Sequence, residues 1–337
     1  MSGGAPPAVG ARRAGPDALG TDPHAAQQWP EQKIVVNGIA VITPTYAADY
    51  ELCCDLHNSI LRFTEDSVIH YLLVAPTDLQ LFSGLQGPRC VVLAANELLP
   101  NRIVYVPAWV NHLLRFAWRK RPHAKLVALN LGRPIPPVRG WIMQQILKLA
   151  AATCIDADIL LLVDSDVRLV RPVDVDTFVQ QGKVRLYRTE GSINEELPRH
   201  VAWHKVANNL LGLRTPEPPL PDYVSAFNVW DRRVVLALID QIERISRRHW
   251  VDVIAGQFDF SEHILYGVFV DGVLGPSANC FATSSSLCHS YWDTMPLDAH
   301  SAETFVESIS ADDVAILIQS KSGTPLNIRR SALARFS

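Results

Sequence analysis

Two aspartates separated by a single residue are the sharpest chemical feature of the sequence. Asp164 and Asp166 directly follow the apolar run Ile159–Val163, which predicts a buried strand. Such a strand cannot keep carboxylates inside a sheet without partners, so we expect it to present them at its carboxyl end, where open α/β sheets bind ligands. At this spacing, with Ser165 between them, two carboxylates can share a divalent cation that neutralises a diphosphate. An Asp-rich capping turn is the alternative.

Polar side chains on a neighbouring helix could reach the same ligand. Residues 140–153 have the length and apolar content of a helix, and Gln144, Gln145 and Lys148 share one face of it because they stand at i, i+1 and i+4. Lys148 is long enough to approach a phosphate. The same spacing also fits a solvated helix face.

The end of the first predicted strand offers a contact for a nucleoside. The run at 34–43 is apolar and rich in β-branched residues, and its last residues lead into a short polar loop with an aromatic side chain: Thr43, Pro44, Thr45 and Tyr46. Such a loop suits a base and ribose. A plain strand-to-helix turn with Thr45 as the cap is the alternative.

A late histidine could complete the cation site. His289 lies among aromatic residues in the segment 288–293, and an imidazole ligand beside two carboxylates would favour manganese over magnesium. A structural histidine is the alternative.

The segment 258–267 concentrates acids near aromatic residues. A transfer that inverts configuration needs a carboxylate base to deprotonate the acceptor hydroxyl, and Glu262 or Asp259 could serve. The alternative is a helix start in which Ser261 is the cap and Glu262 occupies the favourable first turn.

The elements that must position these residues follow the rhythm of a parallel α/β sheet. Apolar runs at 67–75 and 90–94 predict the next two strands, and the helical spacing of Leu52, Leu56 and Ile60 predicts a helix before them. Strands that alternate with helices indicate a mostly parallel central sheet flanked by helices. Further along, we expect a strand at 223–230, a helix at 232–247 and helical structure at 301–319.

Composition limits the class of protein and its partners. The chain has 337 residues, 48% of them hydrophobic, which is enough for one large α/β domain. A net charge of −3 gives no positive field that would indicate a nucleic-acid partner. Six cysteines are scattered without a CxxC pair, so we expect neither a disulfide framework nor a structural zinc site.

Composition also indicates how the first residues behave and whether the chain contacts a membrane. Residues 1–32 are rich in Gly, Ala and Pro, which predicts a disordered leader without the apolar run of a signal peptide. No uncharged apolar stretch reaches membrane-spanning length, so we expect a cytoplasmic protein. The basic and aromatic segment 109–121 permits peripheral contact with a membrane.

Taken together, these segments resemble the GT-A glycosyltransferases and, within them, the bacterial DUF6492-like family. The resemblance lies in VITPTY at 41–46, GWIMQQILKLAAA at 140–152, LLLVDSDVRLVRP at 160–172, FSEHILYGVFV at 260–270 and HSYWD at 289–293. It implies a GT-A domain over 33–297, with a Rossmann-like nucleotide half to about residue 170, an acceptor half after it, and a C-terminal helical extension at 298–337. By this resemblance Asp164 and Asp166 are the metal pair, and His289 matches a late metal-binding histidine.

The resulting prediction is a hexosyltransferase-like enzyme that moves a sugar from a UDP- or GDP-sugar donor to a hydroxyl of a small-molecule or glycan acceptor, with Mn²⁺ or Mg²⁺. A nucleotidyltransferase is one alternative, but residues 43–49 contain neither the Gly nor the Lys of a phosphate loop. A non-catalytic nucleotide- or sugar-binding protein is another, and the intact acids count against it.

Overall fold

A computed structural model describes residues 38–107, 109 and 126–336 of the chain. The predicted disordered leader, the first residues of the run at 34–43 and nearly all of the basic and aromatic segment 109–121 lie outside these residues.

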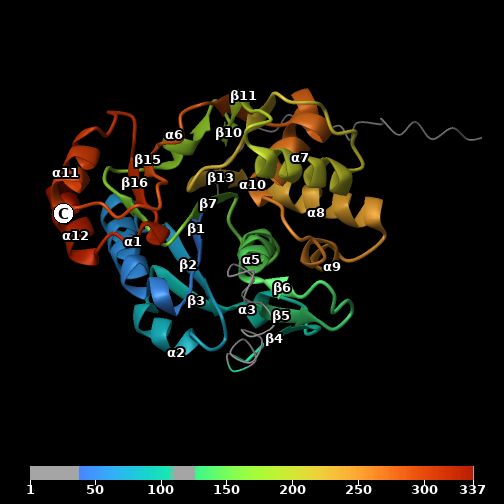
Figure 1. Cartoon of the computed structure of the whole chain (residues 1–337), viewed down its shortest axis with the longest axis horizontal. Coiled ribbons are helices and arrows are strands. Elements are labelled where there is room, and N and C mark those ends of the chain that lie inside the picture. Colours follow the sequence, from blue (N-terminus) through green and yellow to red (C-terminus); the bar gives the residue numbers. More distant parts are fainter. Residues whose placement is uncertain (1–37, 108, 110–125, 337) are drawn as a thin grey trace, which may run out of the picture.

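A five-stranded sheet forms the centre of the molecule (Figure 1). Its strand order is β13-β7-β1-β2-β3, and only β13 runs antiparallel to its neighbour. The strands β1, β7 and β13 are buried throughout, as expected for a sheet covered on both faces, whereas β2 and the edge strand β3 include positions of intermediate burial. The predicted α/β class with a mostly parallel central sheet is therefore confirmed. The bounds are β1 Ile39–Pro44, β2 Ile69–Val74, β3 Cys90–Ala94, β7 Ile159–Val163 and β13 Phe227–Asp231.

Helices cover the two faces of this sheet unequally. Alternate residues of a strand point to opposite faces. Ile42 and Leu162 therefore pack in one core with the helices α5, α7, α8, α9 and α10, whereas Val41 and Leu161 pack in a second core with α1. The bounds are α1 Tyr50–Phe63, α5 Gly140–Cys154, α7 Pro198–Leu211, α8 Arg232–Ser246, α9 Trp250–Ala255 and α10 Glu262–Phe269.

The C-terminal segment differs from the predicted helical extension. It contains α11 (Ala299–Glu307) and α12 (Leu326–Leu333), but the apolar run Ala315–Ile318 between them is a strand, β16. This strand lies between β15 (Cys288–Tyr291) and β8 (Val167–Leu169) in a three-stranded sheet. A four-residue apolar run fits either element, and here the pairing partners decide for a strand. The C-terminal segment therefore returns beside the residues that follow Asp166 (Figure 1).

Smaller elements complete the described part of the chain. Three further sheets pair β5 with β4 and β6, β10 with β9 and β14, and β11 with β12. Their strands are β4 Ile103–Tyr105, β5 Leu126–Asn130, β6 Val138–Arg139, β9 Val179–Gln180, β10 Lys183–Tyr187, β11 Thr189–Ile193, β12 Leu220–Asp222 and β14 Cys280–Thr283. The short helices are α2 Leu79–Phe82, α3 Ala95–Leu98 and α6 Val175–Phe178. No helix among the described residues has the length and apolarity needed to cross a bilayer.

Candidate active site

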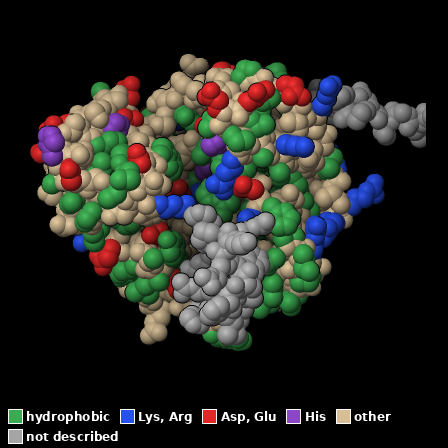
Figure 2. Space-filling model, viewed as in Figure 1, with side chains coloured by type: hydrophobic (Ala, Val, Ile, Leu, Met, Phe, Trp, Pro, Cys, Tyr) green, Lys and Arg blue, Asp and Glu red, His purple; other side chains and the backbone are tan. Residues whose placement is uncertain are grey.

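The candidate site lies where the order of the central sheet reverses. From β1 the chain continues to β2 and β3 on one side, whereas β7 pairs with β1 on the other side, in parallel register. This arrangement is a topological switch point, the place where open α/β sheets bind ligands beyond the carboxyl ends of their strands. Both strands end at the same edge, so the loop that begins at Thr45 lies near Asp164 and Asp166. In the space-filling view, acidic and basic side chains border a hollow near the middle of the face (Figure 2).

A buried contact joins the two strand ends. The Ser165 hydroxyl donates a hydrogen bond to Asp49 Oδ2 at 3.1 Å. Asp49 closes the short 3₁₀ turn Ala47–Asp49, and burial raises the pKa of its carboxyl above the usual value. Tyr46, which is 40% exposed, also has a raised pKa because of burial and the nearby charges of Asp49 and Asp166. The structure therefore brings the predicted nucleoside loop and the aspartate pair together.

The two aspartates have different surroundings. The Asp164 side chain is 41% exposed, and its Oδ1 accepts a hydrogen bond from Lys148 Nζ at 3.1 Å. Asp166 Oδ2 accepts from the backbone N–H of Ser320, at 2.6 Å. Burial and the repulsion of Asp164 and Asp49 raise the pKa of Asp166 to about 6. Two further carboxylates thus destabilise the ionised form of Asp166.

This repulsion is consistent with the prediction that a divalent cation binds at the aspartate pair. A cation between carboxylates would remove the cost of bringing their charges together, and oxygen ligands suit Mg²⁺ and Mn²⁺.

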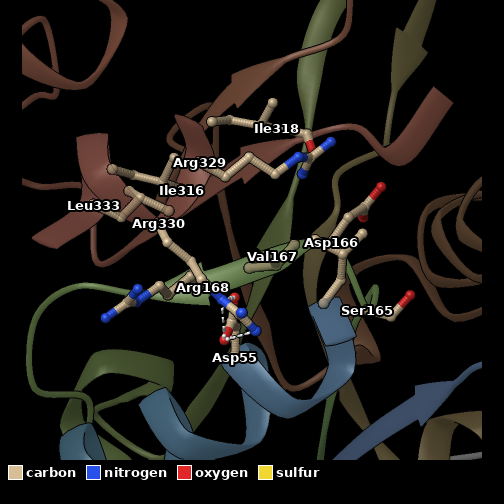
Figure 3. A pocket seen from close by; sticks show the side chains of 11 residues that line it. Asp55, Ser165, Asp166, Val167, Arg168, Ile316, Ile318, Arg329, Arg330 and Leu333 are labelled. Carbon is tan, nitrogen blue, oxygen red and sulfur yellow. Dashed lines mark hydrogen bonds and ion pairs between the residues drawn. The ribbon is translucent and has the colours of Figure 1, made fainter. Parts of the chain in front are cut away.

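Arg329 also acts on Asp166 and Asp49 electrostatically, but each of its three nitrogens donates to a backbone carbonyl: those of Thr324, Ile318 and Gln319. Figure 3 shows Asp166 and Arg329 at the small cavity between α1, β8, β16 and α12. Arg329 therefore holds the loop after β16 in place and adds positive charge near the aspartates. Its hydrogen bonds go to the backbone, so it does not bind the carboxylates as a metal ion would.

A buried network of ion pairs links Asp164 to Lys148 and Glu262. Lys148, on α5, also contacts Glu262 Oε1 at 3.0 Å, and the side chains of Lys148 and Glu262 are only 8% and 3% exposed. Burial alone would lower the pKa of Lys148, but Asp164 and Glu262 raise it above its usual value. Burial alone would raise the pKa of Glu262, but contacts with His263 and Lys148 hold it below its usual value. Both groups are therefore charged at neutral pH.

The predicted roles of Gln145, Lys148 and Glu262 must be revised in this light. Gln145 is buried, accepts from the Glu262 backbone N–H at 3.0 Å and donates to the Trp141 carbonyl, so its amide joins α5 to the start of α10. The Lys148 ammonium forms ion pairs with two carboxylates, those of Asp164 and Glu262, instead of pointing freely toward a phosphate. Glu262 is too enclosed to contact an acceptor hydroxyl, as a general base must. Gln144 is only partly buried, so its predicted contact with the donor stays a prediction.

Other predicted contacts lie on either side of this network. Thr43 is fully buried and its hydroxyl shares a hydrogen bond with His70 Nε2 at 3.0 Å, so it supports the loop rather than a ligand. Asp259 remains 39% exposed beside Arg199, and it accepts a hydrogen bond from Trp203 Nε1 at 2.8 Å. Of the two predicted base candidates, Asp259 is the one that a substrate could reach.

His289 lies apart from the aspartates. Its Nε2 is 2.9 Å from the Phe305 carbonyl and 3.0 Å from Ser308 Oγ, and its ring stacks on Phe305. Along β15 it points toward α11. Within the described residues its imidazole forms no cluster of ligand atoms with Asp164 and Asp166, so this geometry does not support the predicted third ligand.

Three residues of the site were not predicted from the sequence. Asp49 stands in the polar stretch after β1, where an additional carboxylate could have been suspected. Ser320 and Arg329 come from the C-terminal segment, and no motif there indicates that the chain returns to the aspartates.

Comparison with known proteins yields partial structural likenesses. Mouse xyloside xylosyltransferase 1, in its apo form, has a TM-score of 0.43 at 12% identity over 86% of this chain and 99% of that one. The galactosyltransferase LgtC, bound to donor and acceptor sugar analogues, has 0.42 at 11% identity over 88% and 95%. The bifunctional glycosyltransferase WbbM, also apo, has 0.43 at 10% identity over 88% of this chain and 50% of that one. Likenesses at this level do not assign an activity.

The sequence itself gives a firmer result. No curated protein matches it. The model of DUF6492, a family of unknown function, matches residues 34–330. This range includes both strands of the switch point, the aspartate pair and Arg329. The chain is therefore a member of the DUF6492 family.

Proposed function

We propose that the protein is a GT-A glycosyltransferase that moves a sugar from a nucleotide-diphosphate sugar to an acceptor hydroxyl. The observation that carries this proposal is the placement of Asp164 and Asp166 at the carboxyl edge of β7, next to the loop after β1. Burial and the charges of Asp164 and Asp49 raise the pKa of Asp166, and carboxylates with perturbed pKa values are concentrated at functional sites. The sequence resemblance to GT-A enzymes over the same segments agrees with this site.

Each part of the site has a role in the proposal. Asp164 and Asp166 would hold Mn²⁺ or Mg²⁺, which would neutralise the departing nucleotide diphosphate. The loop from Thr45 to Tyr46 would contact the nucleoside. Lys148, fixed by Glu262, orients Asp164 and keeps its carboxylate aimed at the site.

An acceptor would approach from the side of Asp259. Trp141 and Trp203 lie with nearly parallel rings 6.0 Å apart, and the Arg199 guanidinium lies over both. Trp141 is 39% exposed and Phe258 is 66% exposed. Exposed aromatic rings beside a charged pair offer apolar faces and hydrogen-bonding groups to a polyhydroxylated acceptor. We assign Asp259 as the carboxylate that contacts the acceptor hydroxyl.

Metal-dependent donor binding tests the proposal. Calorimetry with UDP- and GDP-sugars is expected to show binding in the presence of Mn²⁺ that excess EDTA abolishes, with release of UDP or GDP once an acceptor is supplied. A nucleotidyltransferase would instead bind a nucleoside triphosphate and release pyrophosphate. Equal donor affinity with and without metal would rule out the role given to the aspartate pair.

Glu262→Gln separates a positioning role from a base role. The substitution keeps the shape of the side chain but removes the charge that faces Lys148, so we expect a loss of roughly 1–3 kcal/mol in the free energy of unfolding, together with weaker donor binding. Urea denaturation and calorimetry on the same variant measure both. A fall in kcat of roughly two to four orders of magnitude, with stability and donor affinity unchanged, would instead restore Glu262 as the base.

A further inference from the structure

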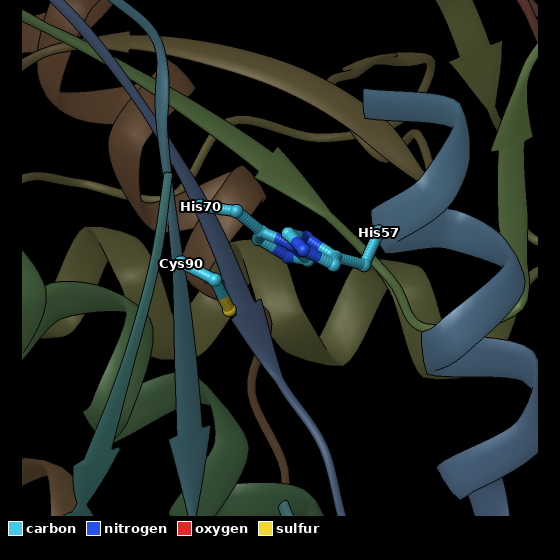
Figure 4. A group of neighbouring side chains, drawn as sticks. All are labelled: His57, His70 and Cys90. Carbon is cyan, nitrogen blue, oxygen red and sulfur yellow. The ribbon is translucent and has the colours of Figure 1, made fainter. Parts of the chain in front are cut away.

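Three potential metal ligands meet in the core behind the nucleoside loop. His57 comes from α1, His70 from β2 and Cys90 from β3, and their ligand atoms all lie within 4.8 Å of one another (Figure 4). His70 and Cys90 are register partners on adjacent parallel strands, so their side chains share one face of the sheet. All three residues are buried, with exposed fractions of 7%, 0% and 1%.

The two imidazole nitrogens that face each other have nearly the spacing of metal ligands. Their Nδ1 atoms face each other at 3.1 Å, close to the separation of about 3.3 to 3.8 Å expected for ligand atoms around a tetrahedral zinc ion. The other nitrogen of His70 lies 3.0 Å from the Thr43 hydroxyl. If Nε2–H donates to that hydroxyl, Nδ1 carries a lone pair directed into the cluster, which is how outer hydrogen bonds fix the tautomer of a ligating histidine.

A fourth candidate ligand lies one helical turn from His57. Cys53 precedes His57 by four residues on α1, so both point from the same face of the helix. Cys53 is fully buried in the same apolar cluster as Cys90. Its sulfur is not among the three ligand atoms that lie within 4.8 Å of one another, so its side chain would have to turn toward them to bind the same ion. Two thiolates and two neutral imidazoles around a divalent cation have no net charge, which suits a buried site.

We propose that Cys53, His57, His70 and Cys90 form a structural site for Zn²⁺, separate from the aspartate pair. The cation would join α1 to the strands β2 and β3. Because Thr43 contacts His70, it would also fix the end of β1 from which the loop at Thr45 and Tyr46 departs. The ligands come from three elements without CxxC spacing, which is why the sequence led us to expect no zinc site.

Metal analysis of the full chain tests this assignment. Protein purified without chelator is expected to retain about one zinc ion per chain after dialysis, and removal of that ion should lower the melting temperature. After exchange to Co²⁺, the protein should show a thiolate-to-cobalt charge-transfer band. Cys90→Ser should lose both the zinc and this band.

Two control variants separate this site from the aspartate pair. Cys288 is equally buried, on β15, and lies near Asp166, so Cys288→Ser should keep both the zinc and the band. Asp166→Asn should also keep them. Folded wild-type protein without zinc and without a charge-transfer band would overturn the proposal. So would zinc that survives in Cys90→Ser and is lost in Asp166→Asn. The cobalt spectrum of the wild type decides the matter even if Cys90→Ser does not fold.

Discussion

Asp166→Asn is expected to weaken metal-dependent donor binding by about 100-fold or more and to remove turnover, with the fold intact. Even residues that only orient metal ligands contribute about 10- to 100-fold to affinity or activity, and Asp166 would be a ligand itself. Asparagine has nearly the same size and can still accept from the Ser320 N–H. It also relieves repulsion with Asp49 and Asp164, so stability should not fall.

The measurements are calorimetry with donor and Mn²⁺, and circular dichroism on the same sample. Asp156→Asn is the matched control, because that side chain is fully exposed and, in the described part of the chain, its ion pair is the long one with Arg232 at 3.5 Å. The control should leave donor binding unchanged. An Asp166→Asn protein that is unfolded would show that Asp166 is structural, and one with wild-type affinity would show that it is no ligand.

The raised pKa of Asp166 gives the same prediction a pH dependence. A cation competes with a proton for this carboxylate, so Mn²⁺ and donor affinity should fall about tenfold per pH unit below about 6. The effect on stability has the opposite sign in metal-free protein. Its folded pKa lies above the unfolded value, so the stabilisation is present at low pH and is lost as the pH rises through about 6. Asp166→Asn should remove both dependences.

The residues that could be predicted are those whose signal is local. Five apolar residues followed by Asp164 and Asp166 indicate a strand end, and the alternation of strands and helices indicates the central sheet. Both signals lie within a few residues. Nothing local connects Lys148 with Glu262, or Asp166 with Ser320, because 114 and 154 residues separate these pairs and only the packed sheet and helices bring them together. For the same reason Glu262 looked like an accessible acid near a helix start, although the fold encloses it.

The second large effect is expected from Lys148, whose ammonium lies between Asp164 and Glu262. Lys148→Met should reduce the free energy of unfolding by about 3–5 kcal/mol, as when one partner is removed from a buried ion pair. Glu262 accounts for most of this, because it is 3% exposed and would keep an uncompensated charge, whereas Asp164 is 41% exposed and can be solvated. Urea denaturation measures the loss. Lys205→Met, at an exposed position of α7, is the matched control and should change little.

A double variant shows whether the cost comes from the buried charge. Combining Lys148→Met with Glu262→Gln leaves no uncompensated charge in the core, so it should recover much of the stability lost by Lys148→Met alone. Donor affinity should not recover with it, because Asp164 still lacks the ammonium that holds its carboxylate at 3.1 Å. If single and double variants lose equal stability, the ion pair is not the cause. If affinity returns together with stability, Lys148 supports only the fold, and Asp164 is oriented by other contacts.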